Sequence, residues 1–122
     1  MKYLMLGYTP AEAWDVSDTA SEEALAAFAE YQKFEEELVA NGELVSTEGL
    51  GHPAVSVTVR PGENGPVATD GPFAELKEVL ASFAVIDVAS QERAIDIVSR
   101  IVAVLGEPIE IRPVMGDDFA QV

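Results

Sequence analysis

The chain has 122 residues, with 22 acidic against 7 basic side chains and a formal net charge of −15. A single domain of this length buries about two-thirds of its unfolded surface and needs no covalent cross-link. Because there is no cysteine, disulfides, thiolate metal sites and thiol nucleophiles are excluded, and the cytoplasm is the expected compartment. The charge repels phosphate backbones and anionic lipids, so we expect no nucleic-acid partner and no membrane; a basic protein partner is the lesser alternative.

The first apolar run, residues 1–8, predicts a β-strand that ends at Thr9-Pro10. The run is shorter than the apolar part of a signal peptide, and no later run approaches the ~20 residues of a membrane-spanning helix. Thr19 and Glu22 have the spacing of a capping box, which predicts a helix start, and Asn41-Gly42 predicts its end. The helix between them carries an apolar stripe: Ala24, Ala27, Phe28, Tyr31, Phe34 and Leu38.

The middle of the chain predicts strands and a hairpin. Residues 43–50 form a strand candidate, and the following alternation of valine with polar residues predicts a strand with one buried and one wet face. The loop at residues 61–66 is rich in proline and glycine, and the short β-compatible run 67–69 returns from it. The alternating valines are Val55, Val57 and Val59.

The last third predicts a strand, a helix and a final strand. Residues 75–78 suit one helical turn, and the apolar run 79–88 suits a central strand covered on both faces. Ser90 is the expected cap of a second helix that ends at Gly106, and a last strand follows at residues 109–112. The predicted stripe of this helix is Ala94, Ile95, Val98, Ile101, Val102 and Leu105.

This order predicts an α+β fold: a ferredoxin-like βαββαβ unit with an antiparallel sheet and an extra hairpin element in its middle. We expect one domain over residues 1–115 and an acidic C-terminal tail over residues 116–122. Because two helices cover only one face of such a sheet, the other face needs a partner, and we expect a homodimer.

Asp70 is the most informative polar residue, because it opens an Asp-Gly-Pro-Phe turn. Its carboxylate either stabilises the turn as an Asx-type turn, by a hydrogen bond from the side chain to the nearby backbone, or serves as a general base or ligand anchor. Gly71 and Pro72 are then scaffold of a ligand-binding turn, and Phe73 is a core residue or a pocket wall. His52 is the only histidine and hence the only candidate imidazole base; the favoured alternative is a solvent-facing loop position without a functional role.

Asp87 lies on an apolar strand and, if buried, needs a partner, for which Arg60 and Arg112 are the candidates. An internal ion pair explains these three residues. If the pair lines a cavity instead, the arginines become binding groups for a small anionic or polar ligand. No metal-ligand spacing, phosphate loop or nucleophile elbow occurs, so we expect no metal, no cofactor and no hydrolase triad.

The chain resembles the YCII-related family, in its DGPF-domain branch. The resemblance runs over nearly the whole chain. It rests on the segments Asp70-Gly71-Pro72-Phe73-Ala74-Glu75, Lys77-Glu78, Phe83-Ala84-Val85-Ile86-Asp87-Val88, Phe34-Glu35-Glu36-Glu37-Leu38, Gly42, Gly49-Leu50, Val57-Thr58-Val59-Arg60 and Glu110-Ile111-Arg112-Pro113-Val114.

The resemblance implies a dimeric α+β barrel but no particular reaction. Members of the wider family have been proposed as enzymes because an acidic residue and a histidine meet in a pocket, and some relatives are linked to RNA polymerase sigma factors of the extracytoplasmic type. Two functional hypotheses follow. One is a small-molecule-binding protein or enzyme with a pocket near the Asp70 turn; the alternative is a non-catalytic regulatory or accessory dimer, for example one linked to such a sigma factor.

Overall fold

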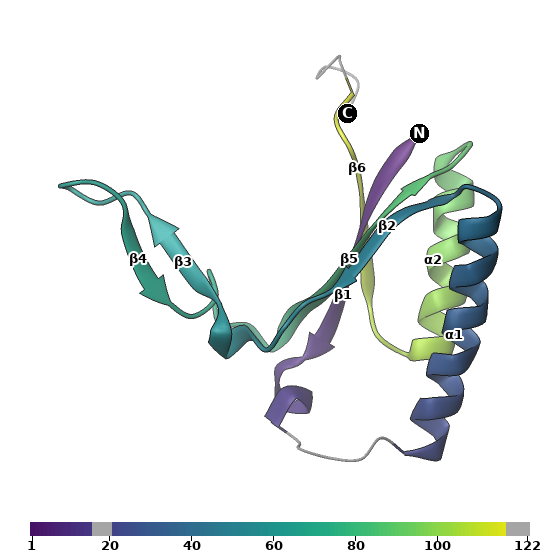
Figure 1. The fold of residues 1–122 in the computed structure, drawn as a ribbon, viewed down its shortest axis with the longest axis horizontal. Helices are drawn as coiled ribbons and strands as arrows, with labels where there is room; N and C mark the ends of the chain where they lie inside the picture. Colours follow the sequence, from purple (N-terminus) through teal and green to yellow (C-terminus); the bar gives the residue numbers. More distant parts are fainter. Residues whose placement is uncertain (16–20, 117–122) are drawn as a thin grey trace.

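The computed structural model describes residues 1–15 and 21–116. A four-stranded antiparallel sheet has the order β2-β5-β1-β6, so β5 and β1 are its central strands (Figure 1). Together with one helix after β1 and one after β5, this order confirms the predicted ferredoxin-like α+β fold. The strands are β1 (Lys2–Pro10), β2 (Leu44–Gly49), β5 (Glu78–Asp87) and β6 (Ile109–Pro113).

Helices α1 (Glu22–Ala40) and α2 (Gln91–Leu105) cover the same face of the sheet (Figure 1). Side chains alternate between the faces of a strand, so every second residue of β1 and β5 meets the helices. The resulting core consists of Tyr3, Met5, Phe34, Leu38, Ala84, Ile86, Val88, Ala94, Ile97, Val98 and Ile101. In residues 1–15 and 21–116, neither helix is long and apolar enough to cross a membrane.

Helix α1 begins at Glu22 and is capped by Ser21, whose hydroxyl accepts a hydrogen bond from the Ala24 N–H at 3.1 Å. The predicted cap at Thr19 lies outside the described residues, as does the tail at 117–122. The predicted end is confirmed, because Asn41 caps the helix and Gly42 has φ +81°. In the predicted stripe, Phe28 remains half exposed because the first half of α1 reaches past the sheet (Figure 1).

Helix α2 confirms its predicted caps, since the Ser90 hydroxyl accepts from the Arg93 N–H and Gly106 adopts φ +76°. Its predicted stripe needs one correction. Ile97 is fully buried while Ile95 is half exposed, because the stripe that meets the sheet follows i, i+3, i+4 and i+7 from Ala94.

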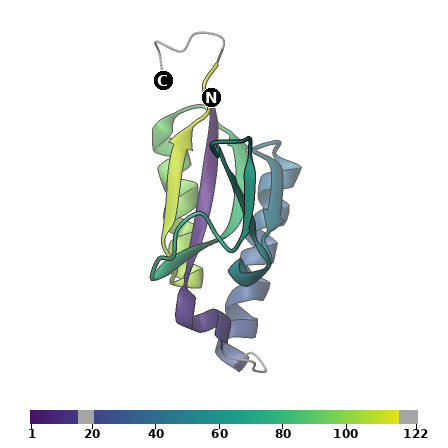
Figure 2. The ribbon, with the colours of Figure 1, turned by 90° about the vertical axis from the view of Figure 1, so that its left-hand side faces the viewer.

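Strands β3 (Val57–Arg60) and β4 (Val67–Asp70) form the predicted hairpin, but as a separate two-stranded sheet. It belongs to residues 51–77, here called the arm, which projects from the face of the sheet opposite the helices (Figure 1). Figure 2 views the molecule from the arm side, with the sheet behind the arm and the helices behind the sheet. The prediction of a buried face on this hairpin is wrong: Val57 and Val59 are 60% and 61% exposed, because the hairpin does not pack on the body.

Two predictions about the approach to β5 are also corrected. Residues 75–77 form no helical turn; the Lys77 carbonyl accepts from the Ala11 N–H at 2.7 Å, and Glu78 begins the strand. β5 is central, as predicted, but only its helix side is buried. On the other side, here called the open face, Phe83 and Val85 are half buried beside Leu4 and Leu6.

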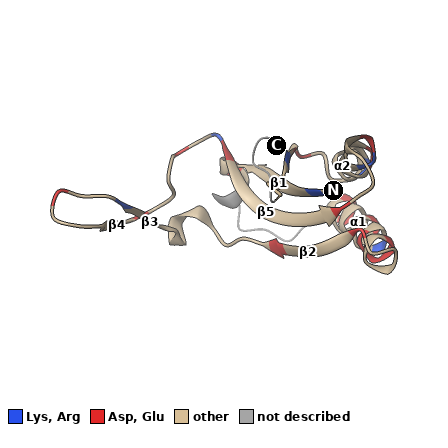
Figure 3. Ribbon diagram, turned by 90° about the horizontal axis from the view of Figure 1, so that it is seen from above, with Lys and Arg blue, Asp and Glu red and all other residues tan. Residues whose placement is uncertain are grey.

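Acidic side chains gather on the helices. Helix α1 carries six glutamates against one lysine, and Figure 3 shows acidic residues on both helices and fewer on the arm. Charged residues on the arm are Arg60, Glu63, Asp70, Glu75 and Lys77.

Candidate functional site

A hollow of about 720 Å³ lies between the arm and the end of the sheet where β1 finishes and β5 begins; we call it the outer hollow. Its walls are mainly apolar and its polar side chains are few, which is the composition of most small-molecule sites. The apolar walls include Leu50, Pro53, Val55, Val57, Val59, Pro72, Phe73, Leu76, Val79 and Leu80, and the polar lining is Tyr8, His52, Ser56, Thr58 and Glu78.

The turn that contains Asp70 is held by its backbone and by Thr58. The Gly71 N–H donates to the Ser56 carbonyl at 2.7 Å, and the Thr58 hydroxyl donates to the Gly71 carbonyl at 2.8 Å. Gly71 has φ +108°, a conformation that side chains disfavour. The Asp70 carboxylate is exposed, makes no hydrogen bond or ion pair with the described part of the chain, and does not line the outer hollow.

Arg60 positions Phe73. Its guanidinium donates to the Phe73 carbonyl at 2.8 Å and lies over the Phe73 ring, 5.2 Å from the ring centre. The ring is 78% exposed and borders the outer hollow, so Phe73 is a wall residue and not part of the core. Arg60 itself is not among the lining residues.

His52 lines the outer hollow and also caps the short 3-10 helix η2 (Pro53–Val55). Its Nδ1 accepts a hydrogen bond from the Ala54 N–H at 3.0 Å. A nitrogen that accepts carries no hydrogen, so in this arrangement the hydrogen of the imidazole ring is on Nε2. One of its two ring nitrogens therefore has a structural role. His52 and Asp70 are not brought onto one cavity wall.

The predicted ion pair of Asp87 with an arginine is wrong. Asp87 is exposed and pairs with the N-terminal ammonium of Met1 at 3.1 Å, because it is the last residue of β5 and sits beside the chain start. Arg112 pairs instead with Glu110 at 2.7 Å, and Glu110 accepts from the Tyr8 hydroxyl at 3.4 Å. Burial and the Glu110 carboxylate raise the pKa of Tyr8.

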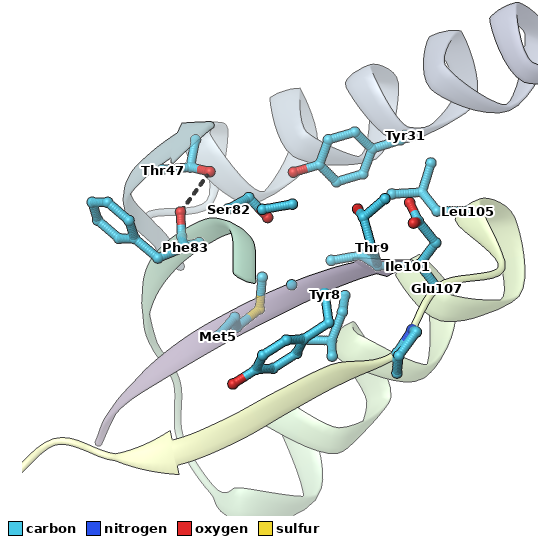
Figure 4. Close-up of a pocket in the computed structure, with 15 residues that line it drawn as sticks. Met5, Tyr8, Thr9, Tyr31, Thr47, Ser82, Phe83, Ile101, Leu105 and Glu107 are labelled. Atoms are coloured by element: carbon cyan, nitrogen blue, oxygen red, sulfur yellow. Dashed lines mark hydrogen bonds between the residues drawn. The ribbon is translucent and has the colours of Figure 1, made fainter. Parts of the chain in front are cut away.

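A second, smaller hollow lies on the helix side of the same end of the sheet; we call it the inner pocket (Figure 4). Its volume is about 70 Å³ and it is partly open. The apolar lining comes mainly from Met5, Ala84, Ile101, Leu105 and Ile109, and the polar side chains around it are Thr9, Tyr31, Thr47, Ser82 and Glu107.

An irregularity of the sheet lies beside the inner pocket. The register of β1 and β5 shifts between Gly7 and Tyr8, which is a β-bulge. Burial, followed by hydrogen bonding to Glu35, raises the pKa of Tyr31 to about 12, so its phenol stays protonated at neutral pH. Sequence reasoning missed this pocket, although a glycine inside a strand is a signal of a bulge.

Within residues 1–15 and 21–116 no group of three or more His, Cys, Asp or Glu side chains is arranged to hold a metal ion. The two hollows are instead lined by hydroxyls, one imidazole and single carboxylates. Such groups are capable of hydrogen bonding and of proton transfer.

The fold and its hollows define a ferredoxin-like α+β domain with an inserted arm. The YCII-related domain family model matches residues 1–118, and the chain belongs to this family. A solved structure with the same fold is 5-chloro-2-hydroxyhydroquinone dehydrochlorinase from Burkholderia phenoliruptrix AC1100, in complex with 2,5-dihydroxybenzoquinone. That protein is 13% identical, the alignment covers 94% of each chain, and the TM-score is 0.52. No curated protein sequence matches the chain.

Proposed function

We propose that the protein binds a small organic molecule in the outer hollow. The observation that carries this proposal is the hollow itself, because its volume falls within the roughly 300–1,000 Å³ of typical ligand pockets and its apolar walls carry few polar groups. Tyr8, His52 and Thr58 supply hydrogen bonds that orient a ligand, while Phe73 supplies a flat wall.

The ligand class that fits these walls is a small ring compound with hydroxyl or carbonyl groups. Phe73 presents an exposed ring for stacking, and Arg60 holds that ring in place. The dehydrochlorinase of similar fold was solved with 2,5-dihydroxybenzoquinone, a compound of this kind. If the protein is an enzyme, Asp70 is a candidate base or anchor only for a ligand that extends beyond the outer hollow, because its carboxylate does not line the hollow and has no partner in the described part of the chain.

We further propose that the protein acts as a homodimer. An isolated two-stranded hairpin is at best marginally stable in water, and the arm exposes Val57, Val59 and Phe73. Within residues 1–15 and 21–116, no layer covers the open face of the sheet. A second copy covers both surfaces at once, and association through them leaves the acidic helices outside, where their repulsion opposes the dimer least.

A thermal-shift experiment with hydroquinone and 4-hydroxybenzoate tests the binding site. We expect both to raise the melting temperature of the native protein, because a ligand that binds only the folded state stabilises it. Val55→Trp fills the outer hollow and should abolish the shift, whereas Val39→Trp, at another exposed position on α1, should keep it.

The same experiment with Asp70→Asn separates the role of the carboxylate from that of the hollow. If Asp70→Asn loses the thermal shift that the native protein shows, the Asp70 carboxylate takes part in binding the ligand. If neither compound shifts the native protein, nor does a wider set of small anionic and polar metabolites, the proposal fails. The alternative is then an accessory dimer that meets a basic partner, such as a sigma factor, through the glutamates of α1.

A further inference from the structure

The inner pocket is separate from the outer hollow in its chemistry. The two share Tyr8 as a lining residue, but the inner pocket lies between the sheet and the helices (Figure 4). None of its lining residues is Lys, Arg, His, Asn, Gln or Trp, so no side chain offers only donors. With one carboxylate and no positively charged side chain in its lining, the pocket favours a neutral or cationic occupant over an anion.

One of the lining hydroxyls has already committed its hydrogen. The Thr47 hydroxyl donates to the Phe83 carbonyl at 3.2 Å (Figure 4). Since a hydroxyl has one hydrogen, the Thr47 oxygen can only accept from a further group. This position thus requires a donor on the ligand.

Glu107 adds a negative charge at the same place. It is half buried, lines the pocket, and makes no ion pair or hydrogen bond with the described residues. In Figure 4 its carboxylate lies near the Thr9 hydroxyl, and the Tyr31 hydroxyl points toward Ser82. A half-buried carboxylate among oxygen acceptors is stabilised by a cation that donates hydrogen bonds.

We propose that the inner pocket binds a small primary amine as its ammonium ion, with the Glu107 carboxylate as the counter-charge and hydroxyl oxygens of the pocket as further acceptors. An ammonium group carries three donors, which matches this set. The volume is about half that of a ~150 Å³ cavity that takes benzene, so the amine has about three or four non-hydrogen atoms, or is the end of a longer chain that leaves through the open side. The proposal does not rest on the proposed function of the outer hollow.

Titration of the ¹⁵N-labelled full-length protein with ethylammonium chloride tests this assignment, with potassium chloride keeping the ionic strength constant. We expect saturable shifts of the backbone amides of Gly7, Thr47 and Ser82. Ethanol and acetate, which match the probe in size but are neutral and anionic, should produce no saturable shift at these amides.

The matched variants are Glu107→Gln and Glu63→Gln, the latter at the exposed tip of the arm. Loss of a charged hydrogen bond should weaken ethylammonium binding about tenfold or more in Glu107→Gln, with no change in Glu63→Gln. Equal shifts with ethanol, acetate or potassium alone, or an unchanged affinity in Glu107→Gln, would overturn the proposal. So would the absence of saturable shifts with ethylammonium.

Discussion

The Ser82 side chain occupies the space that a side chain at Gly7 would fill. A Cβ added at Gly7 would lie 2.5 Å from the Ser82 Oγ and 3.8 Å from its Cβ. The two residues are directly paired across β1 and β5, next to the β-bulge. A side chain at this position would therefore force the Ser82 hydroxyl to move, and this pair forms one wall of the inner pocket.

Gly7→Ala should lower the free energy of unfolding by about 1–3 kcal/mol, because the new methyl group overpacks a filled site. Ser82→Ala removes the clashing oxygen and leaves an ordinary contact at 3.8 Å. The double variant should thus recover most of the loss, which urea denaturation of the four proteins measures as a coupling energy. Additive effects of the two substitutions would contradict the contact.

The native protein should be a dimer in size-exclusion chromatography with light scattering. Val57→Glu together with Val59→Glu should give a monomer, because both side chains are exposed in a single chain and become buried charges when a second copy covers the arm. Val39→Glu, at a similarly exposed position on α1, should remain a dimer. A native protein that stays monomeric at high concentration would contradict the proposed assembly.

Thr58→Val should loosen the turn that contains Asp70. The lost hydrogen bond to the Gly71 carbonyl is worth about 1 kcal/mol, so the Gly71 amide, which donates to Ser56, should exchange with solvent about fivefold faster. Asp70→Asn serves as the control, because the Asp70 side chain makes no hydrogen bond in the described chain. Faster exchange of the Gly71 amide in Asp70→Asn would show that the carboxylate fixes the turn after all.

Glu43 should make the stability dependent on pH. Hydrogen bonds from Arg93, the shortest 2.8 Å, hold the pKa of Glu43 below its ordinary value of 4.5. A lowered pKa in the folded state stabilises the protein above the unfolded pKa, and this contribution is lost as the pH falls through the folded value.

Glu43→Gln should therefore cost about 1 kcal/mol at pH 7, and the difference from the native protein should vanish at acidic pH. Glu37→Gln breaks a longer, more exposed pair with Arg100 and should cost almost nothing. Chemical denaturation across the pH range measures both. A difference for Glu43→Gln that persists below the folded pKa would point to a cause other than the charge.

The fold was predictable where its signals are local. The caps Ser90 and Gly106, and the helix end at Asn41-Gly42, are short patterns with one structural meaning. The exposure of the arm was not predictable in this way, because alternation at Val57 and Val59 records an apolar face and not whether the same molecule covers it.

The candidate site was predictable only in part. Pro72 and Phe73 do border a hollow, together with His52, but Arg112 lies on β6 with its own partner. The inner pocket joins Tyr31, Thr47 and Ser82 from three elements, and each of these residues is unremarkable in sequence. Their meeting follows from the register of the sheet, which no short motif encodes.

The arm enters and leaves the sheet at adjacent points. β2 pairs directly with β5 up to Gly49 and Ser82, and the Leu50 N–H donates to the Ala81 carbonyl at 2.8 Å. The residues between these points can thus be lengthened, shortened or exchanged while the ladder that holds β2 and β5 together stays closed. The arm can therefore change in sequence and length, and with it the outer hollow that it borders, without refolding the domain.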